Sequence, residues 1–203
     1  MAQSLIFIIY EIFSQVVFPP GYTRELFVIS DGATLALDWD QGIPNPDEKP
    51  TKPILIMIPG LAGDSDNMYQ ISLARHVRKH FKVVNLLMRG GNGIPITSGK
   101  LNFPGSWEDV KEGFEYVYNK YIKDKETGEK RCRFYAYGCS MGATTLGLYM
   151  INDSEIANKI IDAAVFYGTP WDFNKNSHYF FNAYGGWPAY IIAKNLCRVT
   201  RAQ

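Results

Sequence analysis

The stretch Phe134-Tyr-Ala-Tyr-Gly-Cys-Ser-Met-Gly-Ala143 sets the fold class expected for this chain. Its first half predicts a buried strand, and its second half has the form Gly-x-Ser-x-Gly at the start of a helix. A serine on such a sharp turn has strained backbone angles and an exposed hydroxyl. Ser140 is therefore the candidate nucleophile, and Gly138 and Gly142 flank it because a Cβ at either position would clash.

Strands and helices are expected to alternate around this stretch. Pro53–Ile58 is a continuous apolar run, typical of a central strand of a parallel sheet, and Asp31-Gly32 indicates a hairpin. Strands are expected at 25–30, 34–39, 53–58, 83–88, 133–137 and 163–167, and helices at 67–80, 106–121, 141–151, 154–159 and 188–196. This order predicts an α/β fold with a doubly wound, mostly parallel sheet.

Two local features refine this expectation. Ser106-Trp-Glu-Asp109 has the form of a capping box, which predicts the start of the helix 106–121. The tail from Trp171 onward is aromatic, and apart from the helix 188–196 it is expected to be irregular.

The composition disfavours several classes of function. The 21 basic and 20 acidic residues nearly cancel to a net charge of +1, so no surface for nucleic acid is predicted. The three cysteines, Cys132, Cys139 and Cys197, form no Cys-x-x-Cys pair, which favours free thiols in a reducing, intracellular compartment. The spacing of the cysteines and histidines fits no metal site, and no cofactor is expected.

The N-terminal segment Leu5–Phe18 is almost wholly apolar, and its few polar residues lie on one helical stripe. An amphipathic helix is expected over 1–20, too short to span a bilayer, which takes about 20 apolar residues. A secretory signal is not expected, because the first basic residue is Arg24. The helix is expected either to lie in a membrane surface or to pack on protein, the second being more common.

A serine nucleophile needs oxyanion donors, a base and an acid. One donor is expected to be the backbone amide of Met141, directly after the nucleophile. The other is expected from the turn Pro59-Gly60-Leu61 after the central strand, with Leu61 as the residue whose amide points at the site.

The base and the acid are harder to place. His76 and His80 fall among basic residues on the expected helix 67–80, which indicates a solvated face. His178 lies in the aromatic tail and reaches Ser140 only if the tail folds back. Asp172 follows the expected strand 163–167 as a candidate acid, although a turn or N-cap role is the more common one. Asp172 and His178 are therefore weak candidates.

Several motifs occur in order over about residues 22 to 175. They are Tyr22-Thr-Arg-Glu-Leu26, Asp31-Gly32, Leu37-Asp-Trp39, Pro59-Gly-Leu-Ala-Gly63, Asn85 with Arg89-Gly90 and Gly93, Glu108-Asp109, Gly138-Cys-Ser-Met-Gly142 and Pro170-Trp-Asp172. Together they resemble the α/β-hydrolase branch that holds the membrane-associated hydrolase-domain lipases, the yeast medium-chain ester synthases/esterases and related bacterial esterases.

This resemblance implies a serine ester hydrolase acting on lipid or short- to medium-chain acyl esters, with no cofactor. It also implies an N-terminal helix at 1–20, a partial hydrolase core at 21–175 and the start of a cap at 176–203. The family's acid and histidine follow later strands, and no position of this chain matches them, so an incomplete chain is expected. The exposed sheet edge then predicts poor solubility or an obligatory partner.

Three hypotheses follow for the function. The first is an esterase or lipase of which this chain is a part. The second is a catalytically inactive scaffold or assembly subunit, whose partner covers the sheet edge, residues 5–18 or the aromatic tail. The third is a module that binds acyl compounds at the elbow without turning them over.

Overall fold

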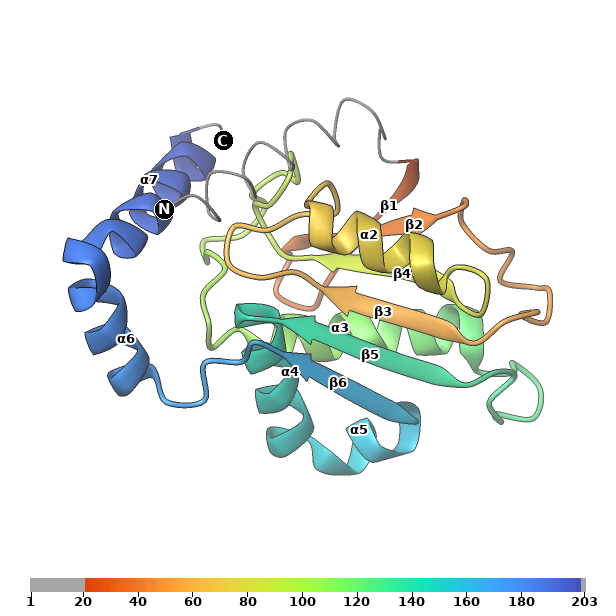
Figure 1. The fold of residues 1–203 in the computed structure, drawn as a ribbon. Coiled ribbons are helices and arrows are strands. Elements are labelled where there is room, and N and C mark those ends of the chain that lie inside the picture. The colour runs from red at the N-terminus through yellow and green to blue at the C-terminus, as the bar shows by residue number, and fades with distance from the viewer. Residues whose placement is uncertain (1–20, 202–203) are drawn as a thin grey trace.

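The structure is a computed structural model that describes residues 21–201 (Figure 1). The helix expected at 1–20 lies outside the described residues. The strands are β1 (Tyr22–Val28), β2 (Thr34–Asp40), β3 (Ile54–Ile58), β4 (Lys82–Leu87), β5 (Phe134–Cys139) and β6 (Ala163–Tyr167). The helices are α2 (Met68–Val77), α3 (Trp107–Val117), α4 (Met141–Asn152), α5 (Ser154–Ile160), α6 (Phe173–Asn182) and α7 (Trp187–Arg201).

The strands form one sheet in the order β1-β2-β4-β3-β5-β6. The hairpin β1–β2 is antiparallel, and β2 also pairs antiparallel with β4. The remaining pairs, β4 with β3, β3 with β5 and β5 with β6, are parallel. The predicted α/β class and the mostly parallel sheet are confirmed, and parallel pairing brings the carboxyl ends of β3 and β5 to one edge.

Helices cover the two faces of the sheet unequally. On one face α2 packs over Leu55, Met57 and Val83. On the other face α3, α4 and α5 build the larger core, in which Val110, Phe114 and Val117 of α3 follow a helical spacing. Figure 1 shows α2 in front of the sheet, where it covers β3 and β4, and α3 behind the sheet.

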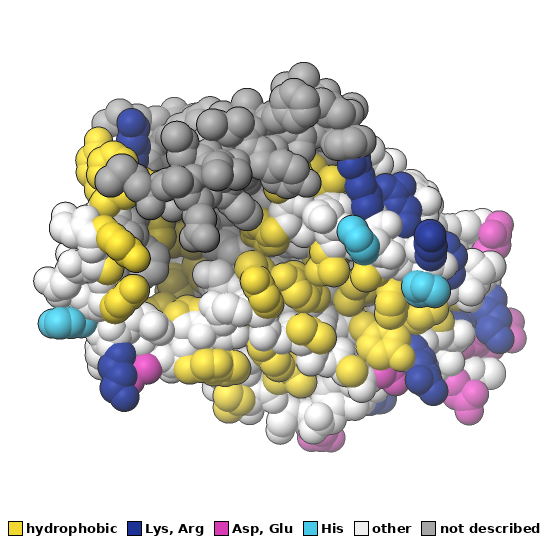
Figure 2. Space-filling model, viewed as in Figure 1, with side chains coloured by type: hydrophobic (Ala, Val, Ile, Leu, Met, Phe, Trp, Pro, Cys, Tyr) yellow, Lys and Arg dark blue, Asp and Glu magenta, His cyan; other side chains and the backbone are white. Residues whose placement is uncertain are grey.

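The β6 end of the sheet is open on the α2 side. Within the described chain β6 has a strand neighbour on one side only, and Val165 and Tyr167 are exposed by 58% and 64%. In Figure 2, drawn from the same direction, hydrophobic side chains gather over this part of the surface. The apolar sequence of β6 thus predicts its strand character but not that one face stays uncovered.

Two expectations were wrong. The first is the side-chain bond of the capping box: α3 does begin after Ser106, as expected, but Ser106 Oγ accepts from the amide of Phe103 and the Asp109 carboxylate accepts from Arg89. The second is the irregular stretch after Trp171, because α6 is helical and a short 3-10 turn, Ala183–Gly186, joins it to α7, which confirms the helix expected at 188–196. No helix among residues 21–201 is long and apolar enough to cross a membrane.

The buried carboxylate of Glu25 connects the hairpin β1–β2 to the core. It accepts hydrogen bonds from Trp39 Nε1 at 2.9 Å, Tyr116 Oη at 2.7 Å, Lys120 Nζ at 2.6 Å and Tyr121 Oη at 2.7 Å. Burial by itself raises the pKa of Glu25, but the bonds from Lys120 and the other donors outweigh it and hold that pKa below its usual value. This cluster joins β1 to β2, α3 and the π-helical turn Tyr118–Ile122.

Glu25→Gln is expected to lower the free energy of unfolding by about 2 kcal/mol at pH 7, because it removes the charge that these donors surround. A depressed folded-state pKa stabilises the fold above the unfolded pKa of about 4.3, and that stabilisation is lost as the pH falls through the folded value. Urea unfolding at pH 7 and pH 3.5 tests this. The gap between the variants should shrink at low pH, whereas the exposed control Glu126→Gln should change little at either pH.

Candidate active site

Ser140 occupies the turn between β5 and α4 with φ of 51° and ψ of −118°. A positive φ is uncommon outside glycine, and it marks the strained turn that the Gly-x-Ser-x-Gly pattern predicts. The Ser140 amide donates to the carbonyl of Tyr167 at 2.8 Å, and its own carbonyl accepts from Ala143 and Thr144. The side chain is exposed at the carboxyl end of β5.

The flanking glycines have no room for a side chain. A Cβ on Gly138 would lie 2.6 Å from Cα of Ala143, and one on Gly142 would collide with the carbonyl oxygen of Pro59 and lie 2.5 Å from that of Ile58. The first turn of α4 therefore rests directly on the backbone at the end of β3 and β5. This contact explains in steric terms why the sequence has glycine at both positions.

The loop Pro59–Gly63 lies against Ser140. A Cβ on Gly60 would stand 3.3 Å from Cβ of Ser140. Leu61 is the next residue of this loop and is 38% exposed. Met141 begins α4, where the amide has no acceptor inside the helix. The fold thus brings to one edge the loop that carries Leu61 and the helix end that carries Met141.

The weak candidates for acid and base have other contacts. Asp172 caps α6, with its Oδ1 accepting from the Lys175 amide at 3.0 Å. His178 is exposed on α6, where its carbonyl accepts from Asn182. His76 lies in the last turn of α2 and His80 in the turn that follows this helix, before β4 begins at Lys82. Among residues 21–201 no hydrogen bond joins the Ser140 hydroxyl to a histidine or a carboxylate.

The chain is similar in sequence to two known proteins. The chain is 29% identical over 133 residues to the embryogenesis-associated protein EMB8 of Picea glauca, covering 63% of the chain and 27% of that protein. It is 26% identical over 202 residues to medium-chain fatty acid ethyl ester synthase/esterase 2 of Saccharomyces cerevisiae, covering 76% of the chain and 43% of that protein. No protein-family model matches the chain.

Solved structures agree on the architecture. An esterase of Pyrococcus furiosus superposes with a TM-score of 0.57 at 15% identity, covering 88% of the chain and 63% of that structure. The chain has the α/β-hydrolase fold. It spans less than half the length of both curated relatives, 27% of one and 43% of the other.

Within the α/β-hydrolase fold, a second polar cluster supports the loop beside Ser140. Asp38 on β2 is buried and accepts from Arg24 Nε and Nη2, both at 2.7 Å, and from the hydroxyl of Ser65. Arg24 Nη1 also donates to the carbonyl of Asn92 at 2.6 Å. Since Ser65 lies two residues after the loop Pro59–Gly63, this cluster connects the end of that loop to the hairpin. The sequence pattern gave no sign of Ser65.

The surroundings of Asp64 and Asp66, in the segment after the loop, disfavour the ionised form of both carboxylates. Burial, with the neighbouring charge of Asp66, raises the pKa of Asp64. Burial and the charge of Asp38 likewise raise the pKa of Asp66, against the opposing effects of Arg24 and Asn92. The segment after the loop therefore carries electrostatic strain at neutral pH.

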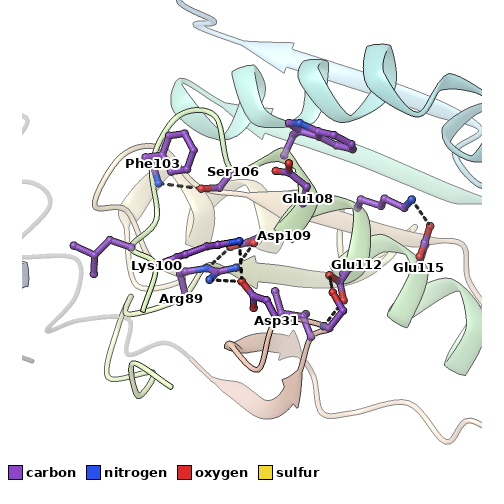
Figure 3. A pocket seen from close by; sticks show the side chains of 14 residues that line it. Asp31, Arg89, Lys100, Phe103, Ser106, Glu108, Asp109, Glu112 and Glu115 are labelled. Atoms are coloured by element: carbon purple, nitrogen blue, oxygen red, sulfur yellow. Dashed lines mark hydrogen bonds and ion pairs between the residues drawn. The ribbon is translucent and has the colours of Figure 1, made fainter. Parts of the chain in front are cut away.

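A hollow lies between the hairpin turn and α3, away from Ser140 (Figure 3). It measures about 660 Å³, and neither Ser140 nor Leu61 lines it. At its wall the guanidinium of Arg89 holds Asp109 through two bonds and Asp31 at 2.9 Å. The charges that line it are thus largely paired with one another, and Arg89, one of the residues that carry the family resemblance, serves the packing of the fold.

Gly142→Ala is expected to destabilise the fold by about 3 kcal/mol, because the backbone of Ile58 and Pro59 cannot yield as a side chain can. Thermal and urea unfolding measure the loss. Gly99→Ala is the matched control, since a Cβ there meets nothing within 4 Å. Equal stability of Gly142→Ala and the native chain would contradict the close contact of α4 with β3.

Asp66→Asn is expected to raise the free energy of unfolding at pH 7 by about 0.5 kcal/mol, allowing for solvent screening. A raised folded-state pKa means that the ionised form destabilises the fold, so the gain should vanish below the unfolded pKa of about 3.9. Urea unfolding between pH 3.5 and 7 tests this. Asp124→Asn should instead lower the free energy of unfolding at pH 7, because the amides of Thr127 and Glu126 hold the pKa of Asp124 below its usual value.

Proposed function

We propose that the chain provides the nucleophile and the oxyanion donors of a serine ester hydrolase. The supporting observation is the strained, exposed Ser140 beside the loop Pro59–Gly63 at the carboxyl edge of the sheet. Nucleophile and donors have to converge on one carbonyl group for acyl transfer, and this edge is where the fold brings their elements together.

The proposed reaction begins when Ser140 Oγ attacks the ester carbonyl and loses its proton to a base. The negative charge that develops on the carbonyl oxygen is bound by the amides of Leu61 and Met141. Collapse of this intermediate releases the alcohol, which takes up the proton, and leaves an acyl group on Ser140. Water then attacks the acyl group by the same route and restores the serine.

We propose that the histidine base and its acid are supplied from outside these 203 residues, by a further segment or a partner chain. Support comes from the Ser140 hydroxyl, which has no such partner among the described residues, and from the cap role of Asp172. The uncovered face of β6, next to the nucleophile strand β5, offers a place for such a contribution.

The proposed substrates are esters of lipids or of short- to medium-chain acids. The name of the yeast relative, a medium-chain fatty acid ethyl ester synthase/esterase, supports an acyl chain of this size. Leu61 belongs to the loop beside Ser140, and the carbonyl of Tyr167 accepts from the Ser140 amide. Both residues expose their side chains, which suit an acyl chain better than a charged group.

Reaction with a fluorophosphonate probe, followed by intact mass and peptide mapping, tests this proposal. The folded chain is expected to react at Ser140 faster than the same chain in urea, and Ser140→Ala should lose that adduct. The rate should remain roughly 10⁴-fold or more below that of a complete triad, because the base is missing.

His178→Ala is the control for the source of the base and is expected to react like the native chain. A large loss of reactivity in that variant would assign the base to His178 and contradict the outside source. A folded chain whose Ser140 reacts no faster than in urea would contradict the nucleophile itself.

A further inference from the structure

We propose that Tyr69 is a positioning residue of this site: it accepts a hydrogen bond from the Gly60 N–H, and by holding Gly60 it supports the adjoining peptide that carries the Leu61 amide. The proposal rests on the function proposed for Ser140 and adds to it a residue that acts through the loop, not on the substrate. Tyr69 is the second residue of α2, nine positions after Gly60, and its side chain is half-buried.

Both polar backbone atoms of Gly60 are held inside the loop. Its N–H donates to Tyr69 Oη at 3.0 Å, and its carbonyl oxygen accepts from the Gly63 amide at 2.9 Å. The loop therefore closes as a turn from Gly60 to Gly63, with Ala62 in the left-handed region at φ of 54°. A non-glycine residue at such an angle needs support from its surroundings.

The bond from the Gly63 amide orients the Gly60–Leu61 peptide, which carries the Leu61 N–H, and the bond to Tyr69 holds the Pro59–Gly60 peptide before it. In a planar trans peptide the carbonyl of Gly60 and the N–H of Leu61 lie on opposite sides. Because the Gly60 carbonyl turns toward Gly63, inside the turn, the Leu61 N–H points out of it. Gly60 itself faces the nucleophile, with 3.3 Å between its Cβ position and Cβ of Ser140.

The hydroxyl of Tyr69 also fills the space inside the turn. It lies 2.8 Å from a Cβ placed on Gly63 and 3.7 Å from one placed on Gly60. Without this oxygen the Gly60 N–H loses its acceptor and the Pro59–Gly60 peptide can rotate. The Gly60–Leu61 peptide shares Cα of Gly60 with it, so the Leu61 N–H shifts as well. An oxyanion donor must stand about 3 Å from the developing charge, so a small rotation removes most of its effect.

Tyr69→Phe separates this role from folding, since it removes only the oxygen. Hydrogen exchange of the Gly60 amide, followed by NMR, is expected to speed up at least about 10-fold, while the Gly63 amide and the thermal midpoint change little. In the fluorophosphonate reaction the maximal rate of inactivation at Ser140 should fall about 10-fold, with the probe concentration for half-maximal rate unchanged.

Tyr135→Phe is the matched control, because it removes a hydroxyl on the same face of the sheet that accepts from Arg133 at the opposite end of β5. It should leave the Gly60 exchange rate and the Ser140 reaction at native values. Unchanged Gly60 exchange or an unchanged maximal rate in Tyr69→Phe would overturn the role of Tyr69. A native Ser140 that does not react at all would instead overturn the proposed function, and Gly60 exchange would still decide whether Tyr69 holds the loop.

Discussion

The direct contact between the first turn of α4 and the backbone at the end of β3 is the constraint on which the site depends. It requires glycine at Gly138 and Gly142, since a Cβ at either position meets backbone atoms at 2.8 Å or less. The same contact places Ser140 at a positive φ and aims its side chain away from the sheet. Strain at this residue is thus maintained by packing that cannot relax without separating α4 from the sheet.

Buried polar contacts connect the hairpin β1–β2 to α3 and to the segment after the loop Pro59–Gly63. Glu25 joins β1 to α3, Asp38 joins β2 to the segment after the loop Pro59–Gly63, and Arg89 joins the hairpin turn to α3. Each is a charge-assisted bond in a site with little access to water, where one missing partner leaves a buried charge unpaired. The antiparallel hairpin is therefore part of the support of the loop beside Ser140.

The support of the loop combines tight and strained contacts. Tyr69 and Gly63 hold Gly60, while Ala62 has a left-handed angle and Asp64 and Asp66 have raised pKa values. Strain of this kind is common where backbone donors have to face a reacting group, because the relaxed arrangement would turn them to solvent. In the function proposed above, the loop and the elbow form the donor side of an acyl-transfer site, to which the described residues add no base.

The sequence alone was sufficient for the elbow, the mostly parallel sheet and the hairpin. Each depends on a local pattern: glycine spacing around Ser140, an unbroken apolar run at 54–58, and Asp31-Gly32 between two strands. Such patterns report backbone geometry and burial, which depend on nearby residues. The resemblance to α/β-hydrolases came from the order of these motifs and agrees with the fold.

Other features were decided by tertiary structure, because they depend on residues far apart in the chain. Asp109 looked like part of a helix cap, but its carboxylate pairs with Arg89, a stronger partner than a backbone amide. α6 was missed because its asparagines and histidine are poor helix formers, although Asp172 caps it. The support of the loop Pro59–Gly63 by Tyr69 and Ser65 has no signature in the sequence, since it exists only once α2 and β2 are brought against that loop.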